Sequence, residues 1–153
     1  MAENFVLGMD AKLYYGDDLL SALVTPATNS WNELDNCMDV NLSLTAGEAE
    51  ITTRANSGWK ATAATLKEGS IDFEMIWKPA DADPGFTAIQ EAWIGGTELS
   101  LMCLDGDEGT SDNQGLASNF VVTNFTRTEP LAEAIKVAVT IKPSSFTEWY
   151  KVA

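Results

Sequence analysis

Apolar and polar side chains alternate along residues 70–78 of this chain. Ile71, Phe73, Met75 and Trp77 occupy every second position, separated mainly by Ser70, Asp72 and Glu74. A period of two residues is typical of a β-strand that buries one face and exposes the other. We therefore expect 70–78 to form a strand whose apolar side covers the core.

Further strands are expected where similar patterns recur between turn-forming residues. They lie at 12–15, 31–44, 97–104, 116–128 and 134–142. In the second of these, Met38, Val40, Leu42 and Leu44 share one face, whereas Asp39, Asn41 and Ser43 share the other. In the last, Ile135, Val137, Val139 and Ile141 alternate with polar or small residues.

One helix is predicted, at 79–96. Its apolar positions Phe86, Ile89, Ala92 and Trp93 follow helical spacing. Asp81, Asp83 and Pro84 are residue types that favour a helix start, and Gly95 with Gly96 favours a helix end.

These elements predict a mainly β protein with a two-sheet antiparallel β-sandwich or barrel and one flanking α-helix. The length of 153 residues fits a single domain, 1–153. We expect a flexible or partner-docked N-terminal arm at 1–8, and a C-terminal tail at 143–153 that carries Phe146, Trp149 and Tyr150.

A long connection, 45–69, separates two of the expected strands. It is rich in Thr, Ala and Gly and lacks a steady period. Connections of this length inside a domain are usually functional or disordered. We interpret it as an extended loop, although its Thr-rich parts, 50–54 and 61–66, are also compatible with a continued two-stranded ribbon.

Net charge distinguishes this connection from the rest of the chain. The protein has 23 acidic and 9 basic residues, a net charge of −14. The 45–69 segment holds three of each, so the remainder carries the whole −14. Such acidity disfavours DNA binding, which requires Lys and Arg. Arg54 and Lys60 are suited to contact an acidic neighbour.

Trp59, in the middle of the same segment, is the next candidate. A tryptophan within a long polar loop either folds back on the core or meets a partner. We favour contact with a partner through Arg54, Ser57, Gly58, Trp59 and Lys60.

Residue types that carry most enzymatic chemistry are missing. The chain has no histidine, which removes the commonest general base and zinc ligand. Cys37 and Cys103 are too few for a disulfide scaffold. The acidic segment 105–115 departs from the EF-hand pattern, because Gly109 stands at a ligand position. We expect no catalytic residues, no metal and no cofactor.

Membrane insertion is not expected either. No apolar run reaches membrane-spanning length, and the N-terminal residues lack the pattern of a secretory signal.

The order of several short segments resembles the major tail tube proteins of long-tailed, siphovirus-like bacteriophages. It begins with Ala11-Lys12-Leu13-Tyr14-Tyr15-Gly16 and Asp39-Val40-Asn41-Leu42. Thr53-Arg54, Gly58-Trp59-Lys60 and Ala64-Thr65-Leu66 follow, ahead of the 70–77 strand. Val122-Thr123-Asn124-Phe125, Glu129-Pro130-Leu131 and the 137–142 strand complete it, so that the resemblance covers nearly the whole chain.

This resemblance implies a structural virion protein that self-assembles into hexameric rings stacked as a tail tube. One sheet of each subunit would line a lumen through which DNA passes without specific binding, and the 45–69 loop would reach neighbouring subunits. Asp39, Asn41, Asp72 and Glu74 are the candidate lumen-facing residues, because acidic walls repel phosphate.

The same resemblance implies partners and a location. Tail terminator, tape-measure and distal tail proteins are the expected partners, in a virion tail whose subunits are made in the bacterial host cytoplasm. Two alternatives stay open: a stand-alone β-sandwich binding or adhesion module, and the tube protein of a contractile or type VI-like injection system.

Overall fold

The computed structural model describes residues 7–34, 36–77 and 84–153. The expected arm at 1–8 therefore lies mostly outside the described residues, as do Asp81 and Asp83. Gly8–Asp10 forms a single 3₁₀ turn ahead of the first strand. Within the described residues, no helix is both long enough and apolar enough to span a membrane.

Seven strands of the described residues pair in the order β2-β1-β5-β6-β7-β4-β3, and every pairing is antiparallel. The bounds are β1 Lys12–Gly16, β2 Trp31–Glu33, β3 Cys37–Glu50, β4 Thr62–Ile76, β5 Glu98–Leu104, β6 Gln114–Thr128 and β7 Lys136–Lys151. The mainly β fold is thus confirmed. The described strands form one continuous hydrogen-bonded sheet and not the two sheets expected of a sandwich.

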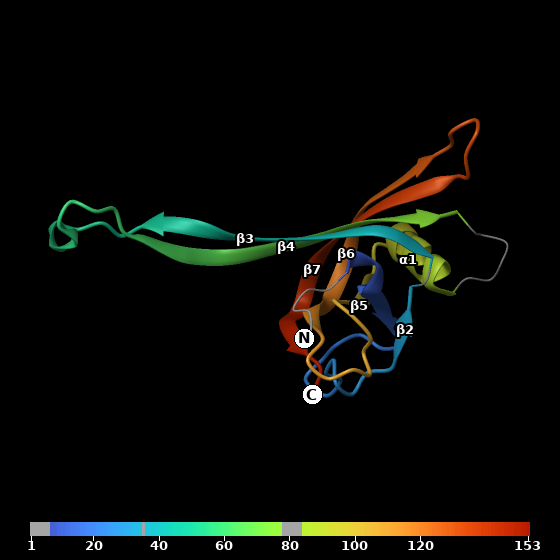
Figure 1. The fold of residues 1–153 in the computed structure, drawn as a ribbon, viewed down its shortest axis with the longest axis horizontal. Coiled ribbons are helices and arrows are strands. Elements are labelled where there is room, and N and C mark those ends of the chain that lie inside the picture. Colours follow the sequence, from blue (N-terminus) through green and yellow to red (C-terminus); the bar gives the residue numbers. More distant parts are fainter. Residues whose placement is uncertain (1–6, 35, 78–83) are drawn as a thin grey trace, which may run out of the picture.

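The main core lies between this sheet and helix α1, Pro84–Gly95. Ile71, Phe73 and Met75 of β4 are buried, as the alternation predicts, and Trp77 packs partly against them. Core residues come from strands as far apart as β1 and β4, so the sheet curves around a common interior. Figure 1 shows the strands of the body gathered beside the helix.

Helix α1 confirms the predicted helix from Pro84 onward. Phe86, Ile89 and Ala92 are buried, and the Phe86 ring meets Trp77 edge-on with centroids 5.2 Å apart. Trp93 departs from the predicted buried stripe and is 45% exposed. Gly96 adopts φ +63° directly after the helix, a left-handed conformation that glycine accepts without strain.

The expected tail at 143–153 is wrong for most of its length. Strand β7 continues to Lys151 and pairs with β6, with Leu116 opposite Trp149 and Gly115 opposite Tyr150. Pro143 lies opposite Phe120 beside an irregularity in the ladder, where a missing N–H is tolerated.

A second, smaller apolar cluster lies on the other face of β1, β5 and β6. It holds Tyr14, Leu20, Met102, Leu104 and Ala117. Leu20 belongs to the segment between β1 and β2, and both of its backbone polar groups bond to the buried side chain of Asn119. This segment is therefore part of the folded body.

Candidate functional site

A two-stranded ribbon projects from the body where the 45–69 loop was expected. Strand β3 continues to Glu50 and β4 begins at Thr62, and the two pair as far as Glu50 opposite Thr62. The loop interpretation is therefore wrong for most of the segment, and the continued ribbon is what the structure has. Only residues 51–61 form the tip. Figure 1 shows the ribbon extending far beyond the rest of the molecule.

The tip has defined local structure. The side chain and backbone of Thr53 exchange capping hydrogen bonds with Asn56 around a short 3₁₀ turn, Arg54–Asn56. Ser57 and Gly58 then adopt left-handed backbone conformations, with φ +52° and +86°. This reversal presents Trp59 to solvent, where its side chain is 79% exposed. An apolar ring this exposed is typical of an interface residue.

The cations of the tip are unpaired among the described residues. Arg54 and Lys60 belong to no ion pair there. By contrast, four other described bases are paired with nearby carboxylates: Lys12, Arg127, Lys136 and Lys151. The tip therefore offers positive charge that this molecule does not use itself.

The four candidate lumen residues lie on two adjacent strands. Asn41 of β3 pairs directly with Asp72 of β4, and Glu74 follows two residues along on the same side of β4. Asp39 lies in the irregular step between Cys37 and Val40, near the same edge of the sheet. Asp39, Asn41 and Asp72 are exposed and Glu74 is half-buried. The structure thus brings these residues together on one side of two paired strands.

Strand β7 widens this polar face. Thr140 lies opposite Asp72 and donates a hydrogen bond of 2.6 Å from its hydroxyl to the Asp72 carboxylate. Beyond it, Thr126 of β6 donates a hydrogen bond to Asn124. Sequence reasoning missed these three residues, because strand alternation reveals sides within one strand but not which strands are neighbours. Their shared polar character at alternate positions was the available signal.

The face is not uniformly acidic. Ile76 of β4 lies opposite Lys136 of β7 at one end of it. Lys136 is held by Glu133, with Nζ and Oε2 3.6 Å apart. The face is therefore polar and acidic near Asp72, and mixed in character toward Ile76.

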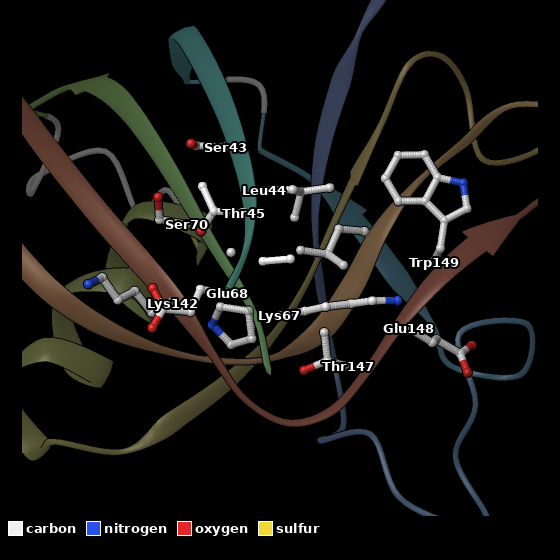
Figure 2. A pocket seen from close by; sticks show the side chains of 14 residues that line it. Ser43, Leu44, Thr45, Lys67, Glu68, Ser70, Lys142, Thr147, Glu148 and Trp149 are labelled. Carbon is white, nitrogen blue, oxygen red and sulfur yellow. The ribbon is translucent and has the colours of Figure 1, made fainter. Parts of the chain in front are cut away.

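An open groove of about 1060 Å³ lies where the ribbon leaves the body. The last pair of β4 and β7 is Ile71 with Ile141, and beyond it the two strands diverge. Figure 2 shows the fork between them, with Leu44 and Trp149 beside the hollow and Lys67, Lys142 and Glu148 around it.

The acidic segment 105–115 forms a turn whose carboxylates bond its own backbone. Asp105 accepts a hydrogen bond from the Gln114 N–H, and Asp107 accepts one from the Gly109 N–H. Burial is the main cause that raises the pKa of the Glu108 carboxyl, followed by the charge of Asp107. Among the described residues, no three potential ligands gather in a metal-binding arrangement.

Comparison with protein-family models and with curated protein sequences gives no match. Solved structures do match. The tail of a gene transfer agent particle, refined with C6 symmetry, has a chain 15% identical to this one, with a TM-score of 0.66 over 97% of this chain and 99% of that chain. The SPP1 tail tube gives 14% identity and a TM-score of 0.69 over 95% and 79%. The fold is a tail tube fold.

Contractile systems share this tail tube fold. The sheath-tube complex of an extracellular contractile injection system matches with 10% identity and a TM-score of 0.61, over 98% of this chain and 94% of that chain. At these identities the comparison establishes the fold alone. The fold implied by the sequence resemblance is confirmed, since the matches span almost the whole length.

Proposed function

We propose that this chain is a structural virion subunit that assembles into stacked rings forming a tail tube. The observation that carries the proposal is the near end-to-end match to the gene transfer agent tail and the SPP1 tail tube. The absence of histidine from the sequence also argues against most enzymatic mechanisms.

In this proposal the rings are hexameric, an inference supported by the C6 symmetry of the gene transfer agent tail. The polar face around Asn41, Asp72 and Glu74 lines the lumen. Water covers such a face readily, and its carboxylates repel the phosphates of passing DNA. DNA then moves past the wall without specific binding.

The ribbon tip is the proposed contact with a neighbouring subunit or ring. Trp59 supplies apolar area, and Arg54 and Lys60 supply cations that lack ion pairs among the described residues. Subunits with a net charge of −14 repel one another, so cations at the contact reduce this repulsion. Ser57 and Gly58 shape the turn that presents Trp59.

Tail terminator, tape-measure and distal tail proteins are the proposed further partners, within a virion tail built from subunits made in the host cytoplasm. A second candidate is the tube of a contractile or type VI-like injection system. The match to the contractile sheath-tube complex favours it.

Sedimentation velocity over a wide range of protein concentrations, followed by negative-stain microscopy, tests self-assembly. We expect rings or hollow filaments as concentration rises, and shorter filaments at low salt, where repulsion between acidic subunits is strongest. A strict monomer at the highest concentration would contradict the proposal and favour a stand-alone binding module.

A further inference from the structure

Leu131 is fully exposed at the end of a second projecting hairpin, formed by β6 and β7. Its side chain has a relative exposure of 106%, the highest among the large apolar residues described. Figure 1 shows this hairpin leaving the body on a different side from the ribbon. A large apolar side chain held away from the core is a candidate contact for another molecule.

Ion pairs brace both arms of this hairpin. Arg127 Nε lies 2.8 Å from Glu129 Oε1 on one arm, and Lys136 Nζ lies 3.6 Å from Glu133 Oε2 on the other. The Arg127 guanidinium also stacks over Trp77, 5.0 Å from the ring centroid. Both carboxylates remain more than half exposed, 55% for Glu129 and 63% for Glu133, so a second cation can approach them.

The groove where the ribbon leaves the body has an apolar lining that could contact an exposed leucine such as Leu131. Leu44 and Trp149 are each about half exposed there, and the largely buried Leu116 and Pro143 complete an apolar lining. At Gly69, an added methyl would lie 3.0 Å from a Leu44 methyl, so glycine keeps the groove open. The hollow is much larger than a leucine side chain.

Charged groups rim this apolar lining. Lys67 and Lys142 line the groove, and neither forms an ion pair among the described residues. Glu68 and Glu148 also line it, so the rim is neutral overall. Figure 2 shows the two lysines on different sides of the hollow, so each is available to a separate negative charge of a ligand.

We propose that the groove of one copy receives the Leu131 tip of a second copy. Leu131 packs on Leu44 and Trp149, and the flanking carboxylates of Glu129 and Glu133 pair with Lys67 and Lys142. This contact rests on the proposed self-assembly but does not involve the ribbon tip.

The tip is unable to reach the groove of its own molecule. Strand β7 is extended between Lys136, beside the tip, and Lys142, beside the groove. Six residues of strand span about 20 Å. We propose a heterologous, head-to-tail contact, which repeats from copy to copy and generates a ring or a filament.

Leu131→Ser tests the apolar part of the contact. Leu23→Ser is the matched control, since Leu23 is 90% exposed in a loop elsewhere on the body. We expect the Leu131 variant to raise the concentration needed for assembly at least tenfold, and the control to shift it less than twofold. Thermal unfolding of both variants should match the parent.

Charge reversal tests the pairing and identifies the occupant. Lys142→Glu should impair assembly, and adding Glu133→Lys should restore it. Lys151→Glu, outside the groove on the same strand, is the control. Failure of both Glu129→Lys and Glu133→Lys to restore assembly of the Lys142→Glu protein would overturn the pairing.

Carbodiimide cross-linking of mixed ¹⁵N-labelled and unlabelled copies gives a second readout. We expect cross-links that join Glu129 or Glu133 of one copy to Lys67 or Lys142 of another. Normal assembly of the Leu131→Ser protein without such cross-links would overturn this contact and leave self-assembly intact. A parent protein that stays monomeric would overturn both.

Discussion

Asn41 and Asp72 lie directly opposite each other on β3 and β4, and Thr140 of β7 bonds the same Asp72 carboxylate. Three adjacent strands therefore present polar groups at one level of the sheet, while Ile71 and Phe73 are buried on the reverse side. Strand β4 thus has one face in the apolar core and the other exposed to water, as the wall of a water-filled channel requires.

Reversing the charge of the polar face from negative to positive should make assembled tubes retain DNA. In tubes of the double variant Asp72→Lys, Glu74→Lys, we expect DNA retention at low salt that weakens steeply as salt rises, because Lys–phosphate contacts release counterions. Parent tubes should retain none. Filter binding with labelled duplex measures the effect.

The matched control for this experiment places the same charge change elsewhere. Asp18→Lys with Glu91→Lys alters two exposed acids outside the polar face. Equal DNA retention by the control and the test variant would mean that net charge, and not the lining of the lumen, governs the interaction.

Removal of residues 57–60 should block tube growth without unfolding the subunit. The deleted residues are exposed and lie beyond the last β3–β4 pair, so the body loses no core contact. We expect a parent-like circular dichroism spectrum and melting temperature, with no tubes in electron micrographs. Trp59→Ala should show a weaker form of the same defect. Tubes of normal length from the deletion protein would refute this role.

Asn119→Ala should destabilise the fold. The Asn119 side chain accepts a hydrogen bond from the Leu20 N–H at 2.7 Å and donates one to the Leu20 carbonyl at 2.8 Å, both buried. Unpaired buried backbone groups cost about 1–3 kcal/mol each, so for the two groups we expect a loss of about 2–6 kcal/mol in urea unfolding. The control Asn32→Ala removes an exposed hydrogen bond to Asp17 and should cost less than about 1 kcal/mol. Similar losses in both variants would contradict this reading.

The Cys103 thiol should react slowly. Burial, with a smaller effect from Asp105, raises its pKa from 9.0 to about 11. At pH 8 the reactive thiolate is then about a hundredfold scarcer than for an unshifted thiol, because each pKa unit is a factor of ten. We expect iodoacetamide to label Cys103 at least tenfold more slowly in the native protein than in urea, measured by mass spectrometry.

The raised pKa of the Cys103 thiol also makes the stability of the fold depend on pH. The unfolded thiol ionises near its ordinary pKa while the folded thiol keeps its proton, so this group lowers stability as pH rises above about 9. Native labelling as fast as labelling in urea would contradict the burial of this thiol.

Local alternation predicted the buried side of β4 well, because Ile71, Phe73 and Met75 face a core that demands apolar groups. The same alternation did not predict the strands of the ribbon. Its strands are solvated on both faces for much of their length, so no alternation marks residues 46–50 or 62–68. The half of β7 beyond Pro143 was missed for a related reason, since its pairing with β6 is decided by backbone hydrogen bonds and not by side-chain pattern.

For the candidate lumen residues, the sequence predicts the polar side of each strand but not which residues pair across strands. The sequence places Asn41 and Asp72 on the polar sides of two strands, but their direct pairing depends on register across a separation of 31 positions, the difference between 72 and 41. The contribution of Thr140 depends further on β7 lying beside β4, a connection made only in the folded chain.

A cryo-electron microscopy map of the assembled protein tests the central proposal most directly. We predict a hollow tube whose inner surface carries the side chains of Asn41, Asp72 and Glu74, with Trp59 against another subunit. A map that buries these polar residues between subunits or turns them to the outer surface would contradict the proposal, as would a protein that never assembles.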